Sequence, residues 1–266
     1  MLALRGRCRD QVMSKQAQKM RSARVANASR PDTGAAAIAG ASLDAIRLER
    51  APRPGLAEQA RARLEEMIVS LALAPGSIWS EAQLSATLAI GRTPVREALQ
   101  RLEADHLVKI LPRHGAQITE INVVEQLLLL ELRRELDRII ARQAARRSTA
   151  QERARLLDMG KRLASRTADD QDILPYLRDH YELKNVLAEC ARNPFLARAV
   201  MPCYAMSRRF YYLHHRQARD LAVATRHHID VIRAVANGDE TKAAAASDKL
   251  MDYVEDFTRA TVTNRF

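Results

Sequence analysis

The sequence predicts a mainly α-helical protein, in which a small domain of three helices and a β-hairpin precedes an all-helical bundle. Only 4% of the 266 residues are aromatic, and the chain holds 9 Gly and 9 Pro. Strands favour aromatic and β-branched residues and sheets need many turns, so this composition disfavours a sheet-dominated fold. Long segments also place apolar residues at three- and four-residue spacings, the period of an amphipathic helix.

Residues 1–52 are predicted to form a flexible basic extension. Residues 1–55 hold 11 Lys and Arg against 4 Asp and Glu, and they include a run of Ala and Gly near residues 34–41. Most of the net charge of +11 therefore lies at this end of the chain. Two interpretations stay open: an arm that attracts phosphate, or an unstructured leader. The second leaves open a true start of the protein at Met13 or Met20.

The expected location is the cytoplasm. No apolar run approaches the roughly 20 residues that cross a bilayer, so we do not expect a membrane protein. The three cysteines, Cys8, Cys190 and Cys203, lack the paired spacing of a zinc ribbon or a disulfide framework. This pattern is typical of a reducing compartment.

Residues 53–121 are predicted to begin with three helices. The first runs from Leu56 to about Leu71 and stops before a Pro-Gly turn, since the residue before proline avoids the α region. The second begins at Ser80, a good N-cap, and ends before Gly91. The third is expected to open with Thr93 as its cap and Pro94 at its first helical position.

A hairpin is predicted to complete this domain. Apolar residues on both sides bracket the turn Pro112-Arg113-His114-Gly115. Three helices followed by a hairpin make a winged helix-turn-helix, in which the second helix of the motif enters the major groove of DNA. Trp79, which follows the Pro-Gly turn, is interpreted as a packing anchor between helices.

The placement of charge supports this interpretation. Arg92 and Arg96 lie at the start of the third helix, away from its apolar face, where each guanidinium is able to take guanine O6 and N7. Thr93 and the open N–H groups there suit a phosphate, and Arg113 and His114 at the hairpin tip suit the minor groove or the DNA backbone. Taken singly, each arginine is more simply a solvated surface charge. Their joint position favours DNA contact.

The same residues resemble a known family, the GntR-type bacterial transcription regulators. The resemblance implies that Arg92, Thr93 and Arg96 contact operator DNA from the recognition helix, and that His114 and Gly115 do so from the wing. Two departures, Gly91 for a common Ser or Thr and Ala82 for an Arg found in some members, suggest a different operator sequence or affinity. The motifs that carry the resemblance are Pro75-Gly76-Ser77, Ser80-Glu81, Gly91 to Leu99, Arg101-Leu102-Glu103 and Arg113 to Ala116.

Residues 122–266 are predicted to form the helical bundle. A long amphipathic helix starts at Val123 and breaks near Ser148-Thr149, and no strand-like segment follows. Bundles commonly hold ligands between facing helices, so this domain is a candidate effector domain. The further helices are expected at about 150–166, 171–191, 194–215, 218–237 and 239–262.

This region resembles the FCD-type effector domain of the FadR subfamily, which also serves for dimerisation. Many members bind a divalent metal through one Asp and three His, with a small carboxylate effector nearby. Here Asp137 and His228 match that pattern, whereas Lys184 and Leu250 stand where the other two histidines are expected. Lysine is cationic at neutral pH and leucine has no lone pair, so the standard ligand set is incomplete. The resemblance is carried by Glu131-Leu132-Arg133, Leu136-Asp137, Asn193 to Leu196, His228 and Gly238-Asp239.

Two ways of completing the site stay open. In the first, a different metal site is rebuilt with His180, His227 or Asp252. In the second, the ammonium of Lys184 replaces the charge of the metal and binds a carboxylate effector together with Arg133. Lys184 is equally consistent with a surface residue. His214-His215 is interpreted as a packing pair, because neighbouring residues on a helix point about 100° apart. The candidate effector-binding residues are Arg133, Asp137, His180, Lys184 and His228.

The predicted function is a sequence-specific DNA-binding transcriptional regulator, expected to be a repressor. A homodimer would read a palindromic operator, since each half-site meets the same surface. One alternative is a nonspecific nucleic-acid-binding protein driven by the basic extension. The other is a metal-dependent enzyme using Asp137, His180 and His228, which is disfavoured because the chain has no nucleophile elbow, Gly-rich phosphate loop or zinc-protease helix.

Overall fold

The elements appear in the predicted order, three helices and a hairpin followed by further helices, and the mainly α-helical fold class is confirmed. The structure, a computed structural model, describes residues 54–168, 172–218 and 221–263, so the predicted basic extension lies outside the described residues. The described residues belong to one compact unit that begins at Pro54.

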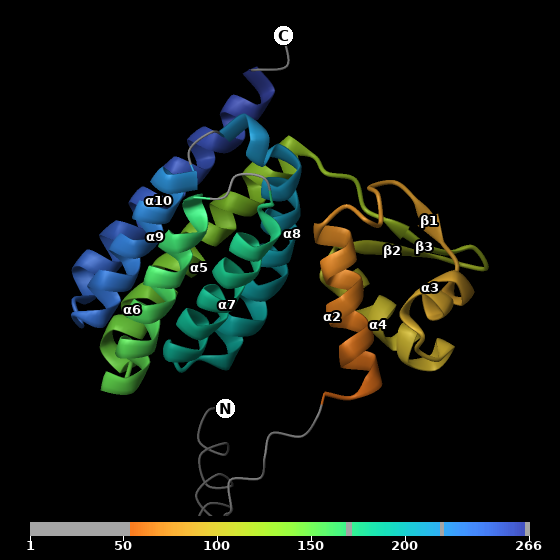
Figure 1. The fold of residues 1–266 in the computed structure, drawn as a ribbon, viewed down its shortest axis with the longest axis horizontal. Coiled ribbons are helices and arrows are strands. Elements are labelled where there is room, and N and C mark those ends of the chain that lie inside the picture. Colours follow the sequence, from red (N-terminus) through yellow and green to blue (C-terminus); the bar gives the residue numbers. More distant parts are fainter. Residues whose placement is uncertain (1–53, 169–171, 219–220, 264–266) are drawn as a thin grey trace, which may run out of the picture. The chain divides into compact units, whose positions relative to one another are not determined.

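The N-terminal domain is a winged helix (Figure 1). Its strands form an antiparallel sheet in the order β1-β3-β2. Val108 pairs with Ile118 and Leu111 pairs with Gly115, which makes β2 and β3 the predicted hairpin. The elements are α2 (Leu56–Val69), β1 (Ile78–Trp79), α3 (Glu81–Leu88), α4 (Arg92–Ala104), β2 (Val108–Leu111) and β3 (Gly115–Ile118).

Helix α3 begins at the predicted residue, whereas the predicted start of α4 is wrong. Ser80 caps α3 in a reciprocal pair with Gln83. The N-cap of α4 is Gly91, not Thr93, and it makes no side-chain cap bond. The helix therefore begins at Arg92 and Pro94 is its third residue. Proline is tolerated there because the first four N–H groups of a helix have no partner within the helix.

The short strand β1 was not predicted. Trp79 pairs with Ala116 of β3, and its indole N–H donates to the Ser77 hydroxyl at 2.9 Å. The tryptophan packs against the core of the winged domain, so its anchoring role holds, but it lies on a strand and not between helices. A strand of two residues is too short to show a period of two in the sequence.

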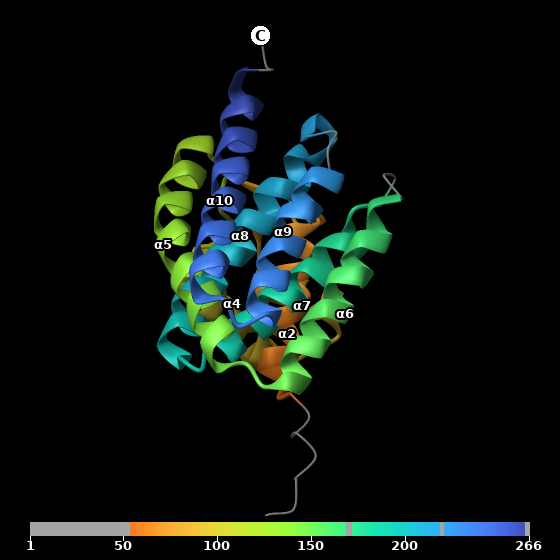
Figure 2. The ribbon, with the colours of Figure 1, turned by 90° about the vertical axis from the view of Figure 1, so that its left-hand side faces the viewer.

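The C-terminal domain consists of long helices packed side by side (Figures 1 and 2). Helix α10 packs along α5 and α9, and α6 packs on α9. Asn122 caps α5, and Thr149 caps α6 reciprocally with Glu152, close to the predicted break. The elements are α5 (Val123–Arg147), α6 (Ala150–Ser165), the 3-10 turn η2 (Arg166–Ala168), α7 (Leu174–Cys190), α8 (Pro194–Ala218), α9 (Leu221–Ala236) and α10 (Glu240–Thr263).

The buried apolar residues form two cores, one for each domain. Helix α8 belongs to the C-terminal domain, yet its Ala205 lies in the core cluster of the winged domain. It also packs against α2. Within the described ranges, no helix is both long and apolar enough to cross a membrane.

Candidate functional site

The N-terminus of α4 is open to solvent and carries positive charge. Arg92 and Thr93 are exposed, and the first turn holds no acidic residue. With Gly91 as the N-cap, no side chain covers the free N–H groups. The helix dipole and these groups favour an anion such as a phosphate at this end.

Arg96 is exposed but held in place by an ion pair. Its Nε and Nη2 donate to the two carboxylate oxygens of Glu81 on α3, at 2.8 and 2.7 Å. The hydrogen bonds with Arg96 lower the pKa of Glu81. Because the pair occupies only one edge of the guanidinium, the edge formed by Nη1 and Nη2 stays free for a second planar partner.

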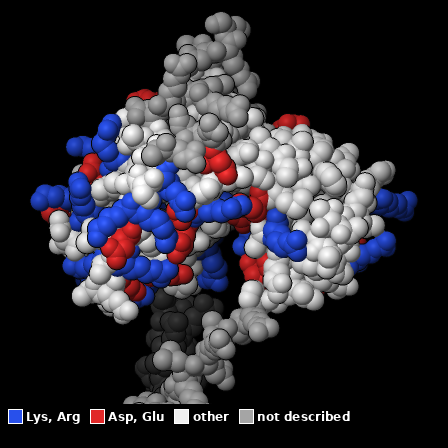
Figure 3. Space-filling view, in the orientation of Figure 1, with Lys and Arg blue, Asp and Glu red and all other residues white. Residues whose placement is uncertain are grey.

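The turn between β2 and β3 presents Arg113 and His114 to solvent. Arg113 has φ 66° and Gly115 has φ 100°, so the turn depends on left-handed backbone. A methyl group on Gly115 would overlap the Trp79 carbonyl oxygen and lie 2.8 Å from Ser80 Cα. Gly115 therefore has a packing role, which the resemblance did not imply. Figure 3 shows Lys and Arg side chains projecting at the right-hand edge of the winged domain.

A second group of predicted residues meets inside the helical domain. Asp137 of α5 accepts a hydrogen bond from Arg133 at 3.0 Å, one from Lys184 of α7 at 3.2 Å, and one from the Tyr204 hydroxyl of α8. All of these side chains are buried. Burial alone would raise the pKa of Asp137, but the charges of Lys184 and Arg133 outweigh it and the pKa is lowered. The carboxylate is therefore ionised, and Lys184 is not a surface residue.

The two predicted histidines lie beside this cluster. The rings of His180 and His228 are 4.4 Å apart at their centroids. Burial lowers the pKa of both imidazoles well below 6.5, and the charges of Lys184 and Arg133 lower it further. Both rings are therefore neutral at physiological pH.

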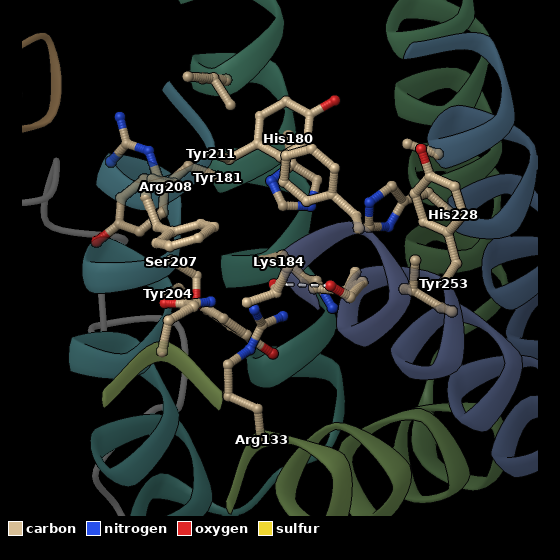
Figure 4. Close-up of a pocket in the computed structure, with 18 of the residues that line it drawn as sticks. Arg133, His180, Tyr181, Lys184, Tyr204, Ser207, Arg208, Tyr211, His228 and Tyr253 are labelled. Atoms are coloured by element: carbon tan, nitrogen blue, oxygen red, sulfur yellow. Dashed lines mark hydrogen bonds between the residues drawn. The ribbon is translucent and has the colours of Figure 1, made fainter. Parts of the chain in front are cut away.

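A cavity of about 70 Å³ lies between these helices (Figure 4). Ligand pockets for drug-sized molecules are typically about 300–1,000 Å³, so this space suits a molecule of few atoms. Arg133, His180, Lys184 and His228 line it, as does Arg208 of α8. Among the described residues, Arg133 Nε, His180 Nε2 and Arg208 Nε are buried without a hydrogen-bond partner. Buried polar atoms without partners are rare and suggest a site for a polar ligand.

The residues present do not fit the metal site that the family resemblance implies. Lys184 and Leu250 line the same cavity as His228, so the expected ligand positions do converge. However, the Lys184 ammonium donates to Asp137, and Leu250 supplies only methyl groups. Within the described part of the chain, no group of three or more His, Cys, Asp and Glu is placed to hold a metal ion.

The other histidines and acids weighed for this site lie elsewhere. His227 packs against the Tyr253 ring, with centroids 5.2 Å apart. Asp252 forms an ion pair with Arg134 at 2.8 Å. His214 is buried against the Phe210 ring. Neither His227 nor Asp252 lines the cavity.

Several residues that line the cavity were not predicted from the sequence, among them three on α8. Tyr204 contacts Asp137, and Arg208 stacks over the ring of Tyr181 with its Cζ 4.2 Å from the centroid. Tyr204, Arg208 and Tyr211 recur at four- and three-residue spacings on α8 and line the cavity together. That polar and aromatic stripe along one helix face is the sequence signal that would have found them.

Comparison with known proteins supports each domain separately. The family model "Bacterial regulatory proteins, gntR family" matches residues 56–118, and the FCD domain model matches residues 128–253. Among solved structures, E. coli McbR/YncC has a TM-score of 0.69 at 17% identity, covering 79% of this chain and 100% of that one. A "putative transcriptional regulator GntR from Rhodococcus sp. RHA1" has a TM-score of 0.57 at 18% identity, and the match covers 79% of this chain and 98% of that one. These structures share the fold.

Curated relatives are transcriptional regulators. The Nta operon transcriptional regulator of Aminobacter aminovorans is 38% identical over 94 residues, 35% of this chain and 44% of that protein. The HTH-type transcriptional repressor RspR of Escherichia coli K12 is 32% identical over 82 residues, which are 31% of this chain and 36% of that protein. The chain thus spans less than half the length of each of these relatives. The matching domains and relatives are those of regulators and not of enzymes. The chain thus carries a gntR-family domain at residues 56–118, followed by an FCD domain at residues 128–253.

Proposed function

We propose that the protein is a repressor that binds operator DNA through the start of α4 and the tip of the wing. The observation that carries the proposal is the exposed pair Arg92 and Arg96 at the start of α4, whose first turn holds no acidic residue and whose N-cap makes no side-chain bond. Thr93 lies beside the open N–H groups, where a phosphate is favoured. Arg113 and His114 at the wing tip are proposed to contact the minor groove or the backbone. RspR, a relative, is named as a repressor, which supports that sign of control.

Glu81 is proposed to aim Arg96 at the base. The carboxylate occupies the Nε edge of the guanidinium and leaves the Nη edge free. A guanidinium that is already oriented loses less conformational entropy when it binds guanine. Gly115 is proposed to contact DNA at the wing and also to shape it, because a side chain there would overlap the backbone of Trp79.

We further propose that two chains form a dimer through α5. Val124, Leu128 and Leu132 recur every four residues and are 65%, 59% and 52% exposed. Residues four apart lie on the same face of a helix, so the three form one apolar stripe. A two-fold axis through this face would present two copies of α4 to a palindromic operator. Sedimentation equilibrium tests the dimer, because it gives a molar mass of 29.9 kDa for a monomer and twice that value for a dimer.

Substitution of the two recognition-helix arginines tests DNA binding. Arg92→Ala or Arg96→Ala is expected to cost about 1–3 kcal/mol, which is about 5- to 150-fold in affinity for the protein's own upstream region. The measurement is a gel shift at physiological salt, against scrambled DNA of equal length. Arg233→Ala, an exposed arginine on α9, is the matched control and is expected to bind like the parent.

Two outcomes would contradict this proposal. If Arg92→Ala and Arg96→Ala both bind like the parent, α4 is not the recognition helix. If the parent binds scrambled DNA as tightly as its upstream region, the protein is a nonspecific nucleic-acid-binding protein, because specific binding exceeds nonspecific binding by at least about 10³-fold.

The helical domain is proposed to bind a small anionic effector, such as a carboxylate, without a metal ion. Arg133 and Lys184 bring two positive charges to the cavity, and Asp137 supplies one negative charge in contact with them. One positive charge is left for a ligand. The neutral His180 offers a ring nitrogen that has no partner among the described residues.

A thermal-shift screen of small carboxylic acids tests the effector proposal. A ligand that binds the native state raises the melting temperature, by an amount that grows with its concentration over the dissociation constant. We expect at least one hydroxy acid, sugar acid or amino acid to raise it equally with and without a chelator. A rise that the chelator abolishes would show that a metal is required.

A further inference from the structure

Two neighbouring arginines on α8 join the helical domain to the winged domain. Arg208 donates to Glu65 at 3.1 Å and to Glu66 at 3.0 Å, both on α2. Arg209 donates to the backbone oxygens of Thr119 at 2.9 Å and Glu120 at 3.1 Å, just after β3. Both arginines are buried. The winged domain is thus held by its first helix and by the end of its wing.

Only one of the two arginines lines the cavity. Neighbouring residues on a helix point about 100° apart, so the two side chains leave α8 in different directions. Arg208 lies in the cavity wall over the ring of Tyr181, whereas Arg209 is not a lining residue (Figure 4). The Nε of Arg208 is buried and has no partner among the described residues. The same guanidinium therefore faces both α2 and the interior of the effector domain.

The carboxylates that bind Arg208 each have a second cationic partner. Glu65 also pairs with Arg61 of its own helix at 2.7 Å, and Glu66 pairs with Arg178 of α7 at 2.7 Å. Removing one partner of a buried ion pair is costly when it leaves a charge alone. If Arg208 turned away, neither carboxylate would be left unpaired. The contact is therefore built so that Arg208 is able to exchange partners.

We propose that Arg208 transmits effector binding to the winged domain: an anion in the cavity competes with Glu65 and Glu66 for its guanidinium. Loss of these bonds frees α2 from α8 and widens the range of positions available to the recognition helix. An effector shifts such an equilibrium only by its differential affinity for the two arrangements, and the exchange of partners supplies that difference. This inference rests on the proposed effector site and names its link to the DNA-binding domain.

An anion fixed inside the cavity tests the proposal without knowledge of the effector. His180→Glu places a carboxylate in the wall that Arg208 shares, and His180→Gln is its neutral match. Spin labels on Gln100→Cys of α4 and Ala154→Cys of α6, both exposed, report the distance between the domains by pulsed electron resonance. All spin-labelled variants also carry Cys8→Ser, so that this cysteine is not labelled. Cys190 and Cys203 are buried and are left unchanged. Mixing with an excess of unlabelled chain suppresses distances measured between two copies.

We expect a narrow distance distribution for the parent and for His180→Gln, and a broad one for Arg208→Met and His180→Glu. The double variant His180→Glu with Arg208→Met is expected to match Arg208→Met alone, because the anion acts through Arg208. A narrow distribution for His180→Glu would overturn the proposal, as would a further broadening in the double variant. If circular dichroism shows that His180→Glu does not fold, Leu250→Glu with Leu250→Gln places the charge on the α10 wall of the cavity. No DNA is used, so a failed gel shift contradicts the proposed function, whereas an unchanged distance contradicts only the role of Arg208.

Discussion

Asp137→Asn is expected to lower the free energy of unfolding of the helical domain by about 3–5 kcal/mol, the usual cost of removing one partner from a buried ion pair. The carboxylate is the only acidic side chain in contact with Arg133 and Lys184 among the described residues. An amide of the same shape keeps the packing but leaves two buried cations without a counter-charge. The cost is therefore electrostatic and does not come from a cavity.

The measurement is urea unfolding followed by the helical circular dichroism signal, with the transition of the winged domain treated separately. Asp248→Asn is the matched control, because Asp248 pairs with Arg138 at 2.7 Å near the surface. Partly exposed pairs contribute about 0–1 kcal/mol. Adding Lys184→Met to Asp137→Asn should restore part of the loss, since it removes one unpaired cation. A loss below about 1 kcal/mol for Asp137→Asn would mean that the cluster is hydrated and not buried.

Gly115→Ala is expected to be the most damaging single substitution in the winged domain. Its φ of 100° is rare for any residue with a side chain, which costs about 1–3 kcal/mol. The added methyl group would also overlap the Trp79 carbonyl oxygen and Ser80 Cα, which are backbone atoms that cannot turn aside. Overpacking of this kind costs about a further 1–3 kcal/mol. The expected result is separation of β1 from β3.

The fluorescence of Trp79, the only tryptophan in the chain, reports this change directly. Unfolding of Gly115→Ala is expected at lower urea concentration than for the parent, with weaker binding to operator DNA. Gly91→Ala is the matched control, because a methyl group there meets only Pro94 Cδ at 3.9 Å and φ is −59°. If both variants unfold with the parent, the wing does not depend on the close approach of Gly115 to β1.

The helices of this protein were largely predictable, because their signals are local. The Ser80 cap of α3 and the break before Thr149 follow from residues within one helical turn. The start of α4 was misplaced by two residues because Gly91 and Thr93 are both acceptable caps in isolation. Strand β1 was missed because its pairing with β3 joins residues almost forty positions apart.

The candidate sites divide in the same way. Arg92, Arg96, Arg113 and His114 were placed by motif, and the structure leaves all four exposed at the surface. Arg133, Asp137, His180, Lys184 and His228 were named from a family resemblance, and the structure brings them together. Arg133 and Lys184 also contact the carboxylate of Asp137, a contact that the resemblance did not imply.

By itself, the sequence determined the order of helices, the winged-helix motif and the resemblance of each domain to a known one, because periodicity, caps and motifs act over a few residues. Only the tertiary structure decided that Lys184 and Arg133 neutralise Asp137, and that Arg208 faces both a cavity and another domain. The Arg208 bond to Glu65 spans 143 positions and the Tyr204 bond to Asp137 spans 67. Such contacts depend on how helices pack, and that packing is set by the whole buried surface and not by any local pattern.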